Sequence, residues 1–203
     1  MKSAIRELGT VEFPEHTGER VYMVKFTKKD GLPANLARWQ STVDQMMARI
    51  EGWTYGYLMI DQGEVKAGQL HRRGGPHVDG NWIEASKDHG GSSGHGATGD
   101  WPPSTGHRPT HQQGDEWRAE HFSPEALVLA TDVEACVGYI GEIEGHPKVG
   151  GDCTHLDFTN TKKVLLRKNV AYSGNVTMVH ESLPIFKDCK RTLVRINVPN
   201  VEI

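Results

Sequence analysis

Short runs of strand-forming residues follow one another between residues 126 and 198. They are separated by turns rich in glycine and asparagine, and they occupy residues 126–133, 135–143, 151–158, 163–168, 174–182 and 192–198. Glycine is abundant in the whole chain, at 23 of 203 residues, which also favours many turns. A series of short strands of this kind is typical of a β-sandwich or a jelly roll. We therefore expect a mainly β fold.

The first part of the chain adds strands and one helix. Alternation over residues 20–27 predicts a first strand. Residues 34–51 predict a helix between Pro33 and Gly52, because apolar residues recur there at helical spacing: Leu36, Trp39, Val43, Met46, Met47 and Ile50. Residues 53–60 and 65–72 predict a hairpin around the sequence DQGE. The expected fold is a jelly roll, or double-stranded β-helix, with an N-terminal helix as a buttress.

Composition sets limits on the class of protein. The length suits one domain, residues 1–203, and the formal net charge of −3 does not indicate nucleic-acid binding, although it leaves a local basic groove open. The three cysteines contain no CxxC pair, which predicts no disulfide framework and a reducing cytoplasm. No stretch approaches the roughly 20 apolar residues of a membrane span. We expect a cytoplasmic protein without membrane contact.

A long segment interrupts the strand pattern at residues 83–122. It is rich in glycine, serine, proline and histidine, and it shows no periodicity. A loop of this length is usually functional or disordered, so it is either a surface insertion or a lid over a site. Four of its histidines (His89, His95, His107 and His111) have irregular spacing, which does not favour a second metal site.

A candidate metal-binding motif lies at His77-Val78-Asp79. Residues i and i+2 of a strand point to the same face, so His77 and Asp79 would point together into the interior of the fold. An imidazole and a carboxylate, joined by a distant second histidine, form the facial triad of non-haem Fe(II) oxygenases. His180 is the candidate for that second histidine.

The chain contains a second HxD sequence, His155-Leu156-Asp157. If the HxD strand comes early in a jelly roll and the lone histidine comes on the penultimate strand, several strands must fit between them. The residues between 79 and 180 are ample for those strands, whereas the residues between 157 and 180 are too few. We therefore select the first motif, and we assign His155 and Asp157 to an intermediate strand that lines or braces the pocket.

The C-terminal segment resembles the last two core strands of the Fe(II)/2-oxoglutarate-dependent oxygenase superfamily. The resemblance consists of a glycine turn, a histidine that ends an apolar strand, a proline turn and an arginine that opens the next strand: Gly174, His180, Pro184 and Arg191. Residues 150–152 resemble the family's Gly-Gly-acidic turn, and HESLP is close to the prolyl-hydroxylase-like branch. The resemblance covers roughly residues 65–82 and 126–198.

The resemblance implies roles for particular residues. His77, Asp79 and His180 would bind Fe(II), and Arg191 would bind the distal carboxylate of 2-oxoglutarate through its planar guanidinium. Arg195 is a second candidate for that carboxylate, a contact for an acidic substrate group, or itself the principal anchor. Softer candidates for hydrogen bonds to 2-oxoglutarate are Tyr139 and Thr154.

Candidate substrate-pocket residues are Gln69, His71, Trp82 and His155. The substrate itself is not readable from the sequence, and a small molecule or a protein side chain both fit. The basic sequence His71-Arg72-Arg73 near the motif keeps an anionic substrate open.

The resulting hypothesis is an Fe(II)- and 2-oxoglutarate-dependent dioxygenase. It would use O2 to hydroxylate its substrate and would release succinate and CO2. One alternative is a cupin-like metal-dependent isomerase, dehydratase or dioxygenase that does not use 2-oxoglutarate. The other is a non-enzymatic jelly-roll binding module.

Overall fold

The computed structural model describes residues 1–79, 82–84, 107–109, 125–148 and 151–203. Within these residues the chain is mainly β and contains one short α-helix, as the strand pattern predicts. The elements in chain order are β1 (Lys2–Ser3), β2 (Ile5–Thr10), β3 (Arg20–Thr27), the 3₁₀ helix η1 (Ala34–Trp39), α1 (Gln40–Met47), β4 (Tyr55–Val65), β5 (Trp82–Glu84), β6 (His107–Pro109), β7 (Glu125–Thr131), β8 (Cys136–Glu142), β9 (Lys162–Leu165), β10 (Val170–Gly174), β11 (His180–Ser182) and β12 (Cys189–Pro199).

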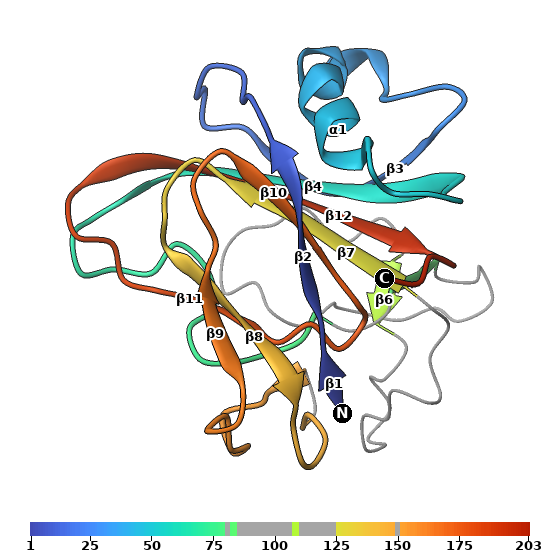
Figure 1. Cartoon of the computed structure of the whole chain (residues 1–203). Coiled ribbons are helices and arrows are strands. Elements are labelled where there is room, and N and C mark those ends of the chain that lie inside the picture. The colour runs from blue at the N-terminus through green and yellow to red at the C-terminus, as the bar shows by residue number, and fades with distance from the viewer. Residues whose placement is uncertain (80–81, 85–106, 110–124, 149–150) are drawn as a thin grey trace.

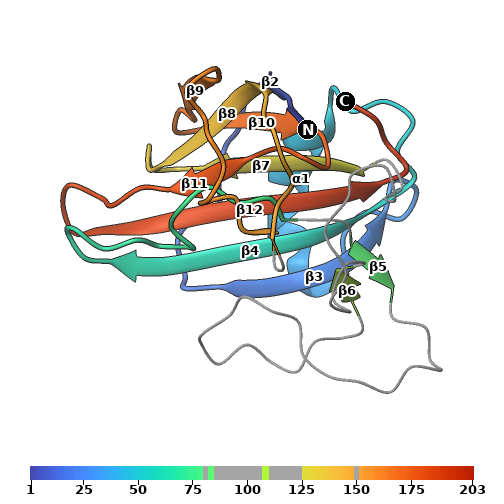
Figure 2. The same cartoon turned by 90° about the horizontal axis from the view of Figure 1, so that it is seen from below.

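The larger sheet is antiparallel and has six strands in the order β2-β10-β7-β12-β4-β3. Figure 2 shows β7, β12, β4 and β3 side by side in this order. The long strand β12 pairs with β4 on one edge and with β7 on the other. Because both edges are hydrogen-bonded, the backbone of β12 is held in place along most of its length.

The smaller sheet contains β1, β8 and β11 in that order, and β9 also pairs with β8. Figure 1 shows β8, β9 and β11 on the side of the larger sheet that is opposite to α1. Between the two sheets, Leu127 and Leu129 of β7 pack in one apolar cluster with Cys136 of β8. Two antiparallel sheets that share an apolar interior are consistent with a β-sandwich.

Alternation along β12 assigns its residues to two different environments. Val194, Ile196 and Val198 pack in the core between the larger sheet and α1. Arg191 and Arg195 occupy the intervening positions, so they project from the inner face toward the smaller sheet. Both arginines are buried. The chain thus places two cationic side chains inside the sandwich.

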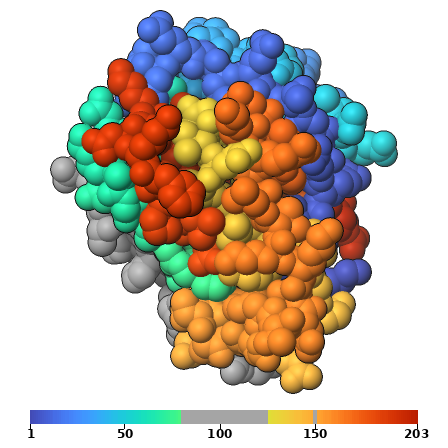
Figure 3. Space-filling view, turned by 60° about the vertical axis from the view of Figure 1, so that its left-hand side comes forward, coloured from blue at the N-terminus to red at the C-terminus, as the bar shows by residue number. Residues whose placement is uncertain are grey.

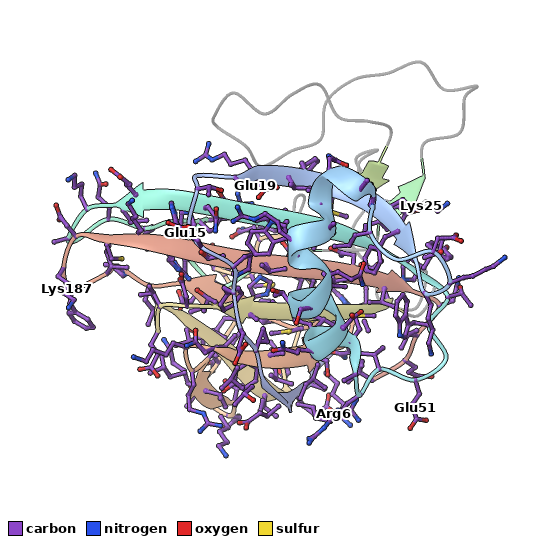
Figure 4. The ribbon with its side chains drawn as sticks, turned by 90° about the horizontal axis from the view of Figure 1, so that it is seen from above. Arg6, Glu15, Glu19, Lys25, Glu51 and Lys187 are labelled. Carbon is purple, nitrogen blue, oxygen red and sulfur yellow. The ribbon has the colours of Figure 1, made fainter. Side chains whose placement is uncertain are left out.

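The predicted helix is present, but it is shorter than residues 34–51. It begins as 3₁₀ helix η1, where the Leu36 N–H donates to the Pro33 carbonyl, and it continues as α1 only to Met47. A second three-residue bond, from Ile50 N–H to the Met47 carbonyl, tightens the end of the helix before Gly52. The predicted apolar face is correct, since all six of its residues are buried in the core against the larger sheet. Figure 4 shows α1 lying across that sheet, with Glu19 beside it; the Glu19 carboxylate accepts a hydrogen bond from Trp39 Nε1 at 2.8 Å.

The predicted hairpin at residues 53–72 is wrong. Residues 55–65 form one continuous strand, β4, which runs through the DQGE sequence. The polar residues Asp61 and Gln62 form ion pairs and hydrogen bonds inside the fold. They therefore do not have to lie in a solvent-exposed turn. Asp61 lies beside the cations Arg20 and Arg72, and Gln62 Oε1 accepts the backbone N–H groups of Thr17 and Glu19.

The predicted strand at residues 151–158 is also wrong. Asp152 makes isolated bridges, and the chain then turns. The Asp157 carboxylate accepts both the backbone N–H and the hydroxyl of Thr159, and Leu156 N–H donates to the Cys153 carbonyl. An aspartate that bonds to the backbone two residues ahead favours a turn over a strand.

Two further differences from the predicted strands concern residues 174–182 and the N-terminal segment. The predicted strand at 174–182 is divided into β10 and the short β11, because a turn closes where Met178 N–H donates to the Asn175 carbonyl. The strands β1 and β2 near the N-terminus were not predicted. They lie against β8 and β10, so their strand conformation comes from pairing with distant segments.

The predicted lid or insertion at residues 83–122 lies largely outside the described residues. Of that part of the chain the structure describes β6 and two residues of β5, and these two strands pair with each other. Across the described ranges, no helix is long and apolar enough to cross a membrane.

Candidate metal centre

The structure brings His77, Asp79 and His180 together inside the sandwich. One ligand atom from each residue lies within 4.8 Å of the others, and the two histidines are buried. Two imidazoles and one carboxylate suit a divalent transition metal, and three ligands on one face of the ion leave its other positions open. The three residues therefore fit a metal ion, as the HxD motif predicts.

The HxD segment is positioned by backbone hydrogen bonds on both of its edges. His77 and His180 each donate their N–H to the carbonyl of the other, at 3.0 and 2.9 Å. On the other edge, Val78 N–H donates to the Gly151 carbonyl at 2.9 Å. Figure 3 shows the green segment that leads toward this motif lying beside the red segment that follows β11; a bond from Gly68 N–H to the Ile185 carbonyl joins the two.

Alternation within the motif separates the ligands from the packing residue. Val78 packs in an apolar cluster with Val137 and Cys153, whereas its neighbours His77 and Asp79 are turned to the other side. The smaller sheet thus gains a short added segment with two ligands on its inner face.

Hydrogen bonds to carbonyl groups fix both imidazole rings. His77 Nδ1 lies 2.7 Å from the Gly75 carbonyl oxygen, and His180 Nδ1 lies 3.2 Å from that of Met178. A carbonyl oxygen can only accept, so each Nδ1 carries a proton, and Nε2 is the ring nitrogen left for a metal. This is how metal-binding histidines are usually oriented.

His77 and Asp79 are in the protonation states that a metal needs. Burial, together with the nearby His180, lowers the pKa of His77 to about 3, so this imidazole is neutral at physiological pH. Burial by itself would raise the pKa of Asp79, but Arg195 and His180 outweigh it and hold the pKa well below its usual value. The site therefore offers a neutral imidazole and an ionised carboxylate.

Arg195 contacts the carboxylate of the motif. Its Nη1 lies 2.6 Å from Asp79 Oδ2, and His180 Nε2 lies 3.4 Å from the same oxygen. Its Nη2 lies 3.8 Å from the sulfur of Met23. Of the two arginines predicted to bind 2-oxoglutarate, this one already holds a carboxylate of the protein itself.

Arg191 lies in a different environment. It is fully buried, and its bonds are to Thr131 Oγ1 at 3.3 Å and to the Ala135 carbonyl at 3.4 Å. Its Nη1 has no hydrogen-bond partner, and no carboxylate of the described residues forms an ion pair with it. Burial lowers the pKa of Arg191, yet arginine stays protonated in proteins.

The nearby thiol of Cys136 does not neutralise Arg191. Burial raises the pKa of Cys136 to about 12, which keeps the thiol uncharged. The carboxylates of Asp132 and Asp61 favour the charged form of Arg191, but neither forms an ion pair with it. A buried cation without a direct ion pair among the described residues is unfavourable, and an anionic ligand would reduce that penalty.

A bulge in β3 brings residues to the site that the sequence did not identify. Val21 and Val24 both pack on the helix side of the sheet, and the strand pairing shifts between them. Tyr22 and Met23 therefore both face the inner side, and Met23 adopts a φ of 49°. Four consecutive apolar residues break the alternation expected of this strand, and that break was the available signal for a bulge.

Gly151 is a second residue whose local role the sequence did not reveal. Its φ is +76°, and a Cβ at this position would lie 2.0 Å from the Val78 carbonyl oxygen. Only glycine permits this approach, and the approach places the Gly151 carbonyl on the HxD segment. The Gly-Gly-acidic sequence pointed to a turn here, but not to its contact with the metal motif.

Three predicted contacts lie away from the triad. Tyr139 lies in the apolar cluster on the outer side of the smaller sheet, where its hydroxyl donates to Glu181 at 2.5 Å. Thr154 and His155 are exposed in the turn after Asp152. These residues do not lie with the triad, because Tyr139 is turned to the opposite face and because the expected strand at 151–158 does not form.

The remaining pocket candidates, Gln69, His71 and Trp82, lie in three different surroundings. Gln69 is exposed in the turn after β4, so it does not line the site. The His71 side chain is 5% exposed, and it lies over Gly63, the cross-strand partner of Arg191. Trp82 belongs to β5, but its side chain is outside the described part of the structure.

The comparisons with known proteins do not assign the chain to a family. No family model, no curated protein and no solved structure matches it.

Proposed function

We propose that the protein is a non-haem Fe(II)- and 2-oxoglutarate-dependent dioxygenase of the superfamily that its C-terminal segment resembles. It hydroxylates a small molecule or a protein side chain. One atom of O2 enters the substrate as a hydroxyl group, the other enters succinate, and CO2 is released. The observation that carries this proposal is Arg191, a buried cation that forms no ion pair with a carboxylate of the described residues, on the same strand face as the arginine that contacts Asp79.

His77, Asp79 and His180 are the residues that hold the metal. When bound, Fe(II) supplies the redox chemistry that couples decarboxylation of 2-oxoglutarate to oxidation of the substrate. The donor set supports iron, since two imidazoles and a carboxylate are the ligands of non-haem iron oxygenases. The carbonyl groups of Gly75 and Met178 keep the two rings in their binding orientation.

Arg191 binds the distal carboxylate of 2-oxoglutarate. Its planar guanidinium can make two parallel hydrogen bonds to a carboxylate, and its Nη1 is the free donor. The Thr131 hydroxyl oxygen accepts from Arg191 Nε and orients the group. Because Arg191 is fully buried, a charge-assisted bond formed there is stronger than the same bond in water.

The spacing along β12 supports a linear co-substrate. Arg191 and Arg195 lie on one strand face, separated by about 13 Å of extended chain. Of the two arginines, Arg195 lies at the metal-binding residues, since it contacts Asp79. Arg191 is therefore set back from the metal, as the binding of a dicarboxylate by its two ends requires.

The fold is compatible with the same proposal. The two facing sheets, the outer helix and the HxD segment added beside β11 support a double-stranded β-helix as the finer description of this β-rich structure.

Anaerobic titration of 2-oxoglutarate into the Fe(II)-loaded protein tests the proposal. Chelation of Fe(II) by a 2-oxo acid produces a visible charge-transfer band, and we expect this band in the wild type. Arg191→Gln should still bind iron, but it should need at least about tenfold more 2-oxoglutarate, because a buried charge-assisted contact is lost. The control is Arg167→Gln, which changes an exposed arginine paired with Glu7 and should titrate like the wild type.

Two results would overturn the proposal. The first is an iron-loaded wild type that forms no band with 2-oxoglutarate, which would favour a cupin-like metal enzyme that does not use this co-substrate. The second is a wild-type titration curve for Arg191→Gln, which would remove the anchor on which the assignment depends.

A further inference from the structure

We propose that His71 binds the distal carboxylate of 2-oxoglutarate together with Arg191. This inference rests on the proposed function, and it gives His71 a role at the co-substrate in place of the predicted role at the substrate. It starts from buried polar atoms that have no hydrogen-bond partner and belong to neighbouring side chains, namely Arg191 Nη1 and both ring nitrogens of His71.

His71 occupies the space that a side chain of β4 would otherwise fill. Its Nε2 would lie 3.0 Å from a Cβ at Gly63, so the imidazole rests on the strand at a residue without a side chain. Gly63 pairs with Arg191 of β12. Directly paired residues of antiparallel strands project to the same face, with their Cβ positions about 5 Å apart. The His71 ring therefore lies beside Arg191, on the inner face of the larger sheet.

The hydrogen bonds of Arg191 come from the opposite edge of β12. Its Nε donates to the Thr131 hydroxyl of β7, and its Nη2 donates to the carbonyl of Ala135, which follows that strand. In the sheet, β12 lies between β7 and β4. The guanidinium is thus held from the β7 side, whereas the imidazole of His71 lies on the β4 side. An anion over β12 can contact both groups.

The imidazole of His71 is enclosed, and its hydrogen-bonding capacity is unused. The side chain is only 5% exposed. Its Nε2 lies 3.6 Å from Asp61 Oδ1, which is longer than a hydrogen bond. An imidazole carries at least one N–H donor, in the neutral form as well as in the charged form. A buried donor without an acceptor is destabilising, so the site favours a ligand that accepts a hydrogen bond.

Asp61 does not prevent a carboxylate from binding next to His71. Arg20 Nε lies 3.3 Å from the Asp61 carboxylate, and Arg72 Nη1 lies 3.0 Å from it. These two cations offset the negative charge of Asp61, so its repulsion of a second carboxylate is weakened.

A carboxylate suits the place between Arg191 and His71. It has two oxygens that accept hydrogen bonds, so it can accept from Arg191 Nη1 and from an N–H of His71 at the same time. This place is distant from the metal-binding residues, because about 13 Å of extended strand separates Arg191 from Arg195. His71 therefore recognises the far end of the co-substrate and not the end that chelates the metal.

Anaerobic titration of two 2-oxo acids into the Fe(II)-loaded protein tests this assignment, with the charge-transfer band as the readout. The probes are 2-oxoglutarate and 2-oxopentanoate, which has the same chelating end and the same number of carbons but a methyl group in place of the distal carboxylate. We expect His71→Leu to weaken 2-oxoglutarate binding about tenfold and 2-oxopentanoate binding by less than about twofold, because only the first loses a charge-assisted hydrogen bond.

Two further variants separate a contact with the co-substrate from a merely structural role. His155→Leu changes a histidine that is exposed in the turn after Asp152, and it should titrate like the wild type with both acids. His71→Asn keeps an N–H donor, so it should recover part of the 2-oxoglutarate affinity that His71→Leu loses.

Gly63→Ala tests the same contact if His71→Leu does not fold. Its added methyl group would lie 3.0 Å from His71 Nε2 and would push the ring away from its place beside Arg191. This variant should also weaken 2-oxoglutarate more than 2-oxopentanoate.

Equal effects on the two acids, whether large or small, would overturn the inference. An equal loss would mean that His71 only maintains the structure of the site, and unchanged binding of both acids would mean that His71 does not contact the co-substrate. Failure of the proposed function is seen separately, as an iron-loaded wild type that gives no band with 2-oxoglutarate.

Discussion

His77 and His180 exchange both of their backbone hydrogen bonds, although more than half of the chain's length separates them in sequence. Each N–H donates to the carbonyl of the other residue, at 3.0 and 2.9 Å, and the ring centroids are 4.6 Å apart. The spacing of the two imidazoles is thus set by backbone pairing. The protein presents two ligands that are already in place before a metal binds, which reduces the ordering that binding requires.

Gly151→Ala should disrupt the metal site more than an ordinary glycine substitution does. The new Cβ would lie 2.0 Å from the Val78 carbonyl oxygen, so the HxD segment must move. Gly18→Ala is the matched control, because Gly18 has nearly the same φ, +77°, with nothing within 4 Å of its Cβ position. We expect Gly18→Ala to lower the free energy of unfolding by about 1 kcal/mol and to leave metal binding unchanged.

Isothermal titration with Mn(II) and urea unfolding of both variants check this prediction. Equal metal affinity in Gly151→Ala and Gly18→Ala would show that the approach of Gly151 to Val78 does not position the ligands.

The metal-free protein should lose stability as the pH falls from about 6.5 toward 3, and His77 should account for part of that loss. The pKa of His77 is about 3 in the folded protein and 6.5 for the ordinary group. Between these values the unfolded chain takes up a proton that the folded chain refuses, so acid favours unfolding. The slope from this one residue is at most about 1.4 kcal/mol per pH unit.

Asp79 acts in the same direction at lower pH. Its pKa is depressed in the folded state, so its contribution is present above the usual value of 3.8 and is lost as the pH falls below that value. Urea midpoints of wild type and His77→Gln, measured at several pH values, isolate the His77 part. Parallel pH profiles for the two proteins would refute the assignment.

Asp61→Asn should be clearly destabilising. The buried carboxylate of Asp61 lies 3.0 Å from Arg72 Nη1, 3.3 Å from Arg20 Nε and 3.6 Å from His71 Nε2. Removal of its charge takes away a buried carboxylate that both Arg20 and Arg72 contact, and we expect a loss of about 2 kcal/mol in the free energy of unfolding.

Asp188→Asn is the control for this variant. Asp188 forms an ion pair with Lys66, but both side chains are largely exposed, so little change is expected. Figure 4 shows the neighbouring Lys187 at the edge of the molecule, away from α1. Similar urea midpoints for Asp61→Asn and Asp188→Asn would mean that burial of the Asp61 cluster contributes nothing.

Local patterns in the sequence predicted part of this structure correctly. The apolar face of the helix could be read from its spacing, because those residues have one large sheet to pack against. The choice of His77 and Asp79 over His155 and Asp157 followed from the number of strands that must lie before His180. In the structure, His77 and Asp79 do lie with His180, and His155 is in an exposed turn.

Other features depend on partners that are distant in sequence. The polar sequence of Asp61 to Glu64 resembles a turn until the cations around Asp61 and the pairing with β12 are known. The positions of Arg191 and Arg195 on one strand face were predictable. Their different partners were not, because the ion pair of Arg195 depends on where the HxD segment packs.

Iron binding by wild type, His180→Ala and His155→Ala tests the central claim most directly. Anaerobic equilibrium dialysis with Fe(II) measures how many ions each chain retains. The structure predicts about one tightly bound ion per chain in wild type and in His155→Ala, and no tightly bound ion in His180→Ala, which has lost an imidazole of the triad. A wild type that retains no iron, or a His180→Ala variant that retains as much as the wild type, would contradict the account.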